Sequence, residues 1–176
     1  MKYSVLDECM QALFDEYVPL SPAQRQRLGQ FCTCVLLAGS SHLPQLARWL
    51  GRQAQQGSRE RWLRRLLDAP FVSQELVYEP WVKNALQPYR PACWHVVLDR
   101  TQWLHEVDLV MVALSYGKRA IPLKWQQVPY GGASTQTYID LLKHCQPLIP
   151  SDVRVVVHGD AEFGAIPMLQ FVQQQG

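Results

Sequence analysis

The chain has little charge of either sign, and its cysteines form no recognised metal-binding pattern. Charged residues make up 18% of the 176 residues and the formal net charge is +2, so the molecule as a whole is not a polycation. The five cysteines include no CxxC pair, and no histidine pair at ligand spacing follows them, which excludes the usual zinc knuckle. We expect buried free thiols in a reducing compartment.

Long hydrophobic runs and targeting signals are also missing. Apolar runs such as residues 34–38 are far too short to span a bilayer. Asp7 and Glu8 stand where a signal peptide would need its apolar core. We therefore expect a cytoplasmic protein with no membrane partner.

The residues that are present predict an α/β protein with two parts. Apolar residues at helical spacing predict helices over residues 4–17, 22–38, 41–50, 58–69 and 73–86. Ser21 and Ser40 or Ser41 are expected as N-caps of the second and third helices, and Ser58 is expected to start the fourth. The composition changes between Pro88 and Pro91, so we place a domain boundary there, with a helical domain over 1–88 and a second domain over 89–176.

Arginine is concentrated in the helical part. Residues 21–65 hold eight arginines and a single acid, Glu60. Two short helices in this stretch, the second rich in arginine, indicate a helix-turn-helix-like layout that contacts DNA phosphates. A solvated helix face on an ordinary bundle is the alternative. The arginines that we expect to bind DNA are Arg48, Arg52, Arg59, Arg61, Arg64 and Arg65.

The second domain changes from helical to extended periodicity. We predict strands over 94–98, 107–115, 119–125 and 153–158, with helices from Ser134 or Thr135 and over 165–174, in the order β-β-β-α-β-α. Pro122 cannot donate to a strand ladder, so the third strand should lie at a sheet edge. A right-handed crossover would return the fourth strand parallel to the first and beside it.

Two carboxylates are then expected at the same edge of the sheet. Asp99 follows the first predicted strand and Asp160 follows the fourth. Close carboxylates repel each other unless they share a proton or bind a cation. Hard oxygen ligands suit Mg²⁺ or Mn²⁺, and two such ions can activate a nucleophile in phosphodiester chemistry. A turn role is the alternative for each aspartate taken alone.

The amino-acid sequence of this region resembles that of the catalytic domain of insertion-sequence DDE transposases. The matching segments are LDRTQW at the first acid, the third strand from Gly117 to Trp125 with one spacing residue shifted, and Asp160 with Phe163 after the fourth strand. HLPQLARWL and SRERWLRRLLDA also look like the helical DNA-binding region of that family. The resemblance implies a partial ribonuclease-H-like domain after a DNA-binding bundle, in a bacterial, nucleoid-associated protein.

The resemblance also implies roles for single residues. Asp99 would be the first catalytic acid and Asp160 the second, both ligands of Mg²⁺ or Mn²⁺, with two ions in the complete enzyme. The third acid of the family, a glutamate on a later helix, has no candidate, because Glu162 is the only carboxylate after Asp160. We therefore expect a truncated, split or frameshifted transposase, inactive alone, with a C-terminal half as a partner.

The same resemblance implies double-stranded transposon-end DNA as the main partner, bound by a homodimer. Arg100 is expected to contact a phosphate, with an ion pair to a neighbouring acid as the alternative, and Trp103 is expected to pack. A non-catalytic DNA-binding protein derived from a transposase is the competing function. A phosphotransferase loop around His158 is disfavoured, since Ala165 stands where that loop needs an asparagine.

Overall fold

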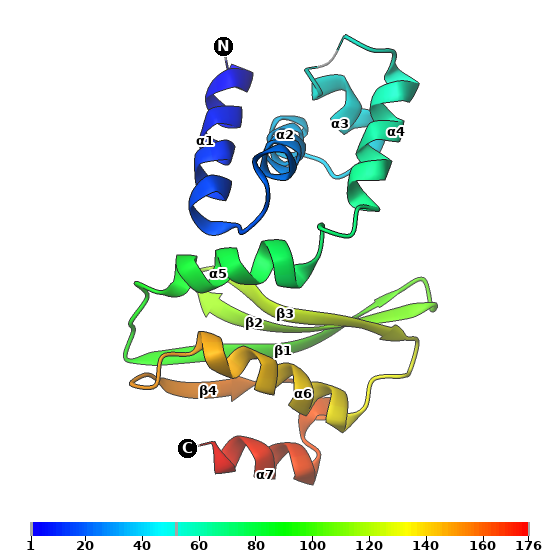
Figure 1. Cartoon of the computed structure of the whole chain (residues 1–176). Coiled ribbons are helices and arrows are strands. Elements are labelled where there is room, and N and C mark those ends of the chain that lie inside the picture. Colours follow the sequence, from blue (N-terminus) through cyan, green and yellow to red (C-terminus); the bar gives the residue numbers. More distant parts are fainter. Residues whose placement is uncertain (1, 52, 176) are drawn as a thin grey trace. The chain divides into compact units, whose positions relative to one another are not determined.

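The computed structural model describes residues 2–51 and 53–175, and these form a mixed α/β protein (Figure 1). Contacts divide the chain into two compact units, Met1–Asn84 and Ala85–Gly176, which we call the helical unit and the sheet unit. The boundary falls inside helix α5, Glu79–Leu86, a few residues before the expected one. None of the helices described is long and apolar enough to cross a bilayer.

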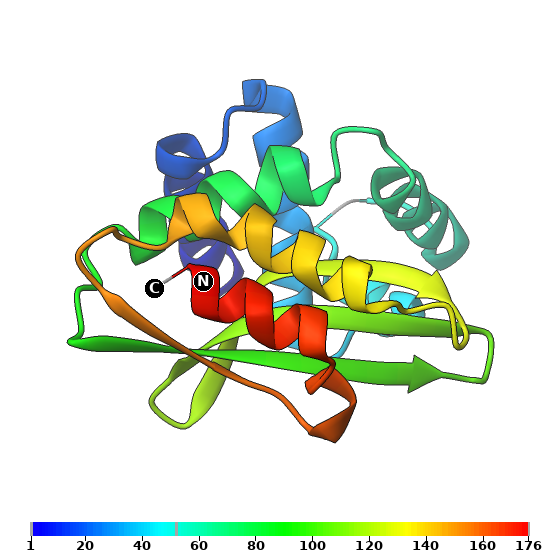
Figure 2. The same cartoon turned by 90° about the horizontal axis from the view of Figure 1, so that it is seen from below.

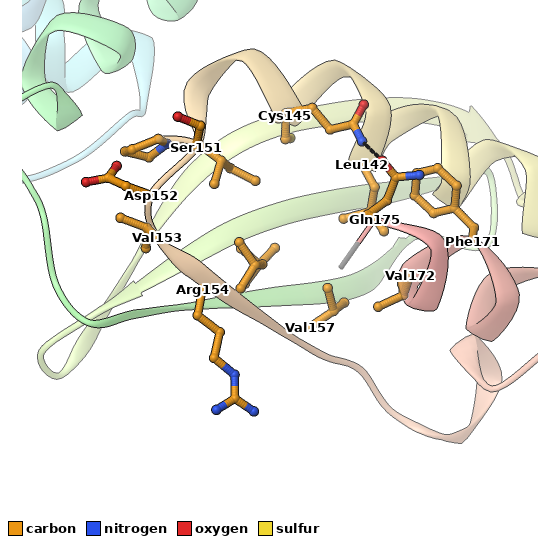
Figure 3. Close-up of a pocket in the computed structure, with 15 residues that line it drawn as sticks. Leu142, Cys145, Ser151, Asp152, Val153, Arg154, Val157, Phe171, Val172 and Gln175 are labelled. Atoms are coloured by element: carbon orange, nitrogen blue, oxygen red, sulfur yellow. Dashed lines mark hydrogen bonds between the residues drawn. The ribbon is translucent and has the colours of Figure 1, made fainter.

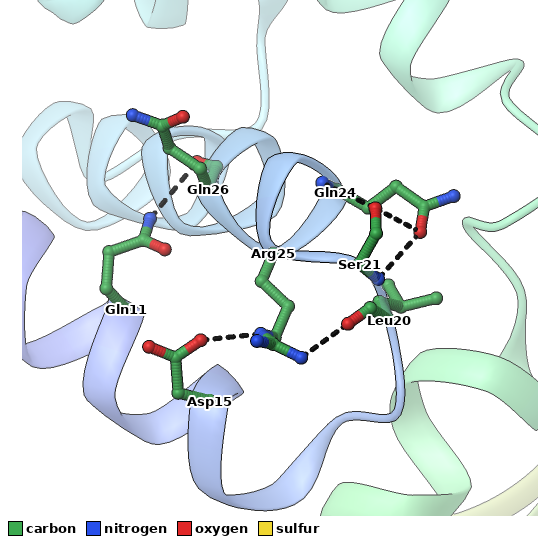
Figure 4. Close-up of polar contacts among 7 residues, drawn as sticks. All are labelled: Gln11, Asp15, Leu20, Ser21, Gln24, Arg25 and Gln26. Carbon is green, nitrogen blue, oxygen red and sulfur yellow. Dashed lines mark hydrogen bonds and ion pairs between the residues drawn. The ribbon is translucent and has the colours of Figure 1, made fainter.

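The helical unit begins with α1, Lys2–Tyr17, and α2, Pro22–Ala38. As expected, α2 starts at Ser21: its hydroxyl accepts from the Gln24 amide, and the Gln24 side chain accepts from the Ser21 amide at 2.9 Å. It ends at Gly39, whose φ of +58° suits a residue without Cβ. Arg25 joins the two helices by an ion pair to Asp15 at 2.5 Å and a hydrogen bond to the Leu20 carbonyl (Figure 4).

The next two helices, α3 at Leu43–Trp49 and α4 at Gln56–Leu67, differ from the prediction at their starts. His42 and Gln55 precede them, and neither makes a side-chain cap. The prediction that serines cap or start these two helices was wrong. Ser40 Oγ accepts from the His42 amide in the segment between α2 and α3, and Ser58 lies inside α4. Residues 50–55 separate the helices, which is longer than the three or four residues usual in a helix-turn-helix.

Two apolar clusters hold the helical unit together. The first lies where α2, α3 and α4 meet and contains Cys34, Leu46, Ala47, Leu50 and Leu63. The second lies between α1 and the start of α2 and contains Phe14, Val18, Leu20 and Leu28. Leu67, in the last turn of α4, is 41% exposed and belongs to neither cluster. After α4, Ser73 caps a π-helical turn, Gln74–Tyr78, that leads into α5.

The sheet unit contains four strands in the order β3-β2-β1-β4. Strands β1, Cys93–Trp103, β2, Val107–Tyr116, and β3, Arg119–Pro129, are antiparallel neighbours. Strand β4, Arg154–His158, lies parallel to β1 and beside it, as predicted from the crossover. Strand β3 lies at an edge, as Pro122 indicated, and a bulge falls next to that proline, at Val112/Ala113.

Helices cover one face of this sheet. Helix α6, Thr135–Cys145, starts at a capping box on Ser134, and α7, Ile166–Gln174, follows β4. Figures 1 and 2 show both helices on the same side of the strands. The residues that face them alternate along the strands, so the core of the unit is built from every second position: Trp94, Val96 and Leu98 of β1, and Val110, Val112 and Leu114 of β2.

Candidate functional site

The two candidate acids follow the same pair of the β1–β4 ladder. In the parallel ladder Val97 pairs with His158. Asp99 is two residues beyond Val97, and Asp160 is two residues beyond His158. Paired strands lie about 4.8 Å apart, so Val97 and His158 are close, and each acid follows this pair by two residues, Asp99 within β1 and Asp160 beyond the end of β4. The C-terminal end of β4 lies at the edge at which open α/β sheets place their ligands.

The prediction that Asp99 ends its strand was wrong. β1 continues to Trp103, and Asp99 pairs with Met111 of β2. Its side chain is exposed and alternates with the buried Leu98. Asp99 therefore projects from the face opposite α6 and α7, on a central strand that has a neighbour on each side.

Asp160 lies where β4 gives way to a short 3₁₀ turn, Ala161–Phe163. It caps this turn, because its Oδ1 accepts from the Glu162 amide at 3.0 Å. One carboxylate oxygen is thus occupied by the backbone, while the side chain as a whole remains exposed. Gly159 precedes it, and a Cβ there would meet the Phe163 ring at 2.8 Å, so the turn is built closely around this glycine.

Arg100 connects the neighbourhoods of the two acids. Its Nη2 donates to Glu162 Oε2 at 2.5 Å, and its Nη1 lies 3.4 Å from Asp108 Oδ2. Of the two roles considered for Arg100, the ion pair is therefore present. Burial lowers the pKa of the guanidinium, but the charges of Glu162, Tyr138 and Asp108 more than offset this and raise it overall. Glu162 in turn supplies the amide that bonds to Asp160, so Arg100, on the face of β1 opposite to Asp99, holds the turn that carries Asp160.

Asp108 is a functional candidate that the sequence analysis missed. It is 0% exposed, accepts from the Gly131 amide at 3.0 Å, and its Oδ1 has no hydrogen-bond partner among the described residues. The signal was present, since Asp108 shares a strand face with Val110 and Val112, which are buried. A carboxylate on an inward face needs a partner, and Arg100 is the cation available.

Tyr138 of α6 completes this group. Its ring meets Phe163 edge-on with centroids 4.7 Å apart. Burial, followed by the nearby charge and hydrogen bond of Glu162, raises the pKa of its hydroxyl, which therefore stays protonated at neutral pH. Arg100, Asp108, Glu162 and Tyr138, which we call the Arg100 cluster, thus form a polar support beneath the turn at Asp160.

The arginines of the helical unit fall into two groups. Arg48, Arg64 and Arg65 are exposed, and the structure describes no partner for them. Arg59 instead donates to the carbonyls of Ala54, at 2.7 Å, and Ala47, at 3.2 Å, and so fastens the start of α4 to α3.

Two arginines that were expected to bind DNA remain, Arg61 and Arg52. Arg61 is exposed and, among the described residues, bonds only to the Gly57 carbonyl of its own helix, at 3.3 Å. Arg52 lies outside the described residues.

Other expectations about this chain were wrong. Trp103 does not pack but is 65% exposed at the β1–β2 turn, where Leu104 and His105 have positive φ. The cysteines are all free, but only Cys34 and Cys145 are buried, whereas Cys9 is exposed.

A cavity of about 460 Å³ lies under α6 and α7 (Figure 3). Its walls include Val96, Val157, Leu142 and Phe171, and the Arg154 side chain points away from it. Neither candidate acid lines it. The cavity is therefore separate from the Asp99–Asp160 region.

No family model matches the chain, and no curated protein and no solved structure shows significant similarity to it. Among residues 2–51 and 53–175, no three His, Cys, Asp or Glu side chains group closely enough to hold a metal ion. Its class therefore rests on its fold alone, which is mixed α/β with a four-stranded sheet.

Proposed function

We propose that this chain is a DDE-transposase-type protein, in which the helical unit binds double-stranded DNA and the sheet unit is the first part of a ribonuclease-H-like catalytic domain. The observation that carries the proposal is the parallel β1–β4 register, with Asp99 and Asp160 two residues past the same pair. Strand order β3-β2-β1-β4 followed by a helix also agrees with the start of that fold.

The two acids are suited to a divalent cation. Both are exposed, no protein hydrogen bond is described for Asp99, and Asp160 gives one of its oxygens to the Glu162 amide. Asp99 and Asp160 would hold Mg²⁺ or Mn²⁺, and such an ion supplies charge neutralisation at a phosphodiester. The chain's own contribution is to fix the acids, through the β1–β4 ladder and the Arg100–Glu162 ion pair.

Cutting and joining of DNA would need a third acid. Glu162 is engaged with Arg100, so it is not free to serve as that ligand in the described arrangement. We therefore propose that turnover requires a carboxylate from another polypeptide segment, such as a C-terminal half of the enzyme.

DNA binding is tested by fluorescence anisotropy of the full chain on a short labelled duplex, titrated at several salt concentrations. Each arginine–phosphate contact contributes about 0.9 to the slope of log K against log salt. That slope is negative, and Arg64→Ala/Arg65→Ala should reduce its magnitude by roughly 2, while Arg154→Ala, at an exposed arginine of the sheet unit, should leave it unchanged. A wild-type slope near zero would contradict the proposal.

A second function is favoured by a separate observation. The exposed arginines of α3 and α4 do not depend on the carboxylates, so the protein could bind DNA without catalysing any reaction. In that case substitution of Asp99 or Asp160 would change neither DNA binding nor metal binding.

A further inference from the structure

Two histidines on neighbouring strands meet beside the candidate acids. His95 Nδ1 of β1 lies 2.8 Å from His158 Nε2 of β4, with ring centroids 5.1 Å apart and planes inclined by 30°. His95 pairs with Val156, and His158 with Val97, so the two rings are diagonal neighbours across the parallel ladder. Both side chains are exposed.

The geometry points to a two-histidine site for a borderline transition metal such as Ni²⁺, Cu²⁺ or Zn²⁺. Metal–nitrogen bonds of about 2.0–2.1 Å place two nitrogens about 2.9 Å apart at a right angle and about 3.3 Å apart at a tetrahedral angle. The observed N–N distance of 2.8 Å matches the right angle of tetragonal or octahedral coordination, but the centroid separation of 5.1 Å shows that the two rings face each other end to end. Both exposed rings must therefore turn by roughly 45° for their lone pairs to meet at one ion; Ni²⁺ or Cu²⁺ then keeps the present N–N distance, whereas Zn²⁺ needs it to widen.

Binding requires one proton to move but none to be lost. Between neutral rings, one of the two facing nitrogens donates its hydrogen to the other. When a metal binds, the donor ring carries its proton on its outward nitrogen instead, His95 Nε2 or His158 Nδ1, and both facing lone pairs bind the ion. Water fills the remaining positions, since no third ligand of the usual types is grouped there among the described residues.

The site is distinct in chemistry from the pair of acids. Asp99 and Asp160 offer oxygens, which suit Mg²⁺ and Mn²⁺, while imidazole nitrogens select metals later in the first row. The two histidines are carried by paired strands, one of them central in the sheet, so the ligand positions are set by the ladder rather than by a loop. This inference does not depend on DNA binding or on transposition.

Ni²⁺ is the probe of choice, because it prefers right angles and does not oxidise the free thiols. Isothermal titration of the full chain at neutral pH gives the number of sites and their affinity. We expect His95→Ala and His158→Ala each to weaken one Ni²⁺ site at least about tenfold, a loss typical of ligand shells. His144→Ala is the matched control, an exposed histidine of α6 that bonds to the Asp140 carbonyl.

The titration is read together with circular dichroism of each variant without metal. If an alanine variant fails to fold, the glutamine variants His95→Gln and His158→Gln replace it. Loss of the same site in both histidine variants, with the His144→Ala isotherm unchanged, supports the inference. A wild-type chain that binds no Ni²⁺, or a double variant that binds as the wild type does, overturns it.

Discussion

The helical unit and the sheet unit organise charge in opposite ways. In the helical unit the arginines expected to bind DNA mostly project from helix faces, while Arg25 and Arg59 each tie two elements together. In the sheet unit Arg100 is shared between Asp108 and Glu162, and its position depends on strand register. Exposed cations can therefore tolerate imprecise placement, whereas carboxylates that share a partner need the hydrogen-bonded ladder between strands to position them.

Removal of a buried partner in the sheet unit should have the largest effect. Asp108→Ala leaves the partly buried Arg100 with one acid and the Gly131 amide with none, so we expect a loss of about 3 kcal/mol in the free energy of unfolding. Asp99→Ala, on the exposed face of the neighbouring strand, should change it by less than about 0.5 kcal/mol. Hydrogen exchange of β1 and β2 amides measures both. Equal effects would remove the distinction between the two aspartates.

Arg59 should behave unlike its neighbours in the helical unit. Arg59→Ala breaks two hydrogen bonds to the Ala47 and Ala54 carbonyls, and we expect it to cost about 1–2 kcal/mol. Arg61→Ala, two residues along the same helix, should cost less than about 0.5 kcal/mol. Urea unfolding of the two variants gives the comparison. If Arg61→Ala proved the more damaging, Arg59 would not fasten α4 to α3.

The cap of α2 gives a smaller effect. Ser21→Ala removes the hydroxyl that accepts from the Gln24 amide, so we expect a loss of about 1 kcal/mol. Ser58→Ala, inside α4, is the control, because that serine caps nothing and alanine is the better helix former. Thermal unfolding should therefore show a lower midpoint for Ser21→Ala and an unchanged or higher one for Ser58→Ala.

Alkaline pH should weaken the helical unit through its thiols. Burial raises the pKa of Cys32 and of Cys34 from 9.0 to about 11, with Asp7 and Cys32 adding to the effect at Cys34. A group whose folded pKa is raised stabilises the fold below its ordinary pKa, and that contribution is lost as the pH rises through the folded value. Stability should thus fall between pH 9.0 and about 11.

Guanidinium unfolding across this range checks the effect. Cys32→Ala/Cys34→Ala should flatten the pH dependence, whereas Cys9→Ala, at an exposed thiol, should not. A wild-type curve as flat as that of the double variant would mean that these thiols ionise equally in both states.

The order of strands could be predicted from the sequence, but their ends could not. The apolar residues 94–98 predicted the first strand, and Pro122 predicted an edge. β1 nevertheless runs to Trp103, because residues 99–103 pair with β2 and only one face needs to be apolar. Asp99 therefore lies within β1, four residues before its end, and not at the end of the strand as predicted.

Helix starts failed for a different reason. Serines at 40 and 58 are expected near helix starts because their hydroxyls can accept from helix amides. In the structure Pro44 lies in the first turn of α3, and Gln56 starts α4 two residues before Ser58, with its side chain bonded to the Pro44 carbonyl at 2.8 Å. Such tertiary contacts decide between nearby starts, and spacing alone does not show them.

Polar contacts across the sheet unit were the least predictable feature. Glu162 lies 62 residues after Arg100, and only the β1–β4 pairing brings the two together. Asp108 was hidden in an apolar run, although its alternation with Val110 placed it on the buried face. The alternation of buried and exposed residues along this strand is thus the sequence signal that predicts a buried acid at position 108.

The central claim is that Asp99 and Asp160 bind one divalent ion as a pair. Electron paramagnetic resonance of free Mn²⁺, titrated with the chain and with Asp99→Asn, Asp160→Asn and the double variant, measures this directly, with Asp152→Asn as an exposed control. The account predicts that each single variant weakens Mn²⁺ binding at least about tenfold and that the double variant adds little more, because the ligands act together. Independent, additive effects, or wild-type binding in either single variant, would contradict it.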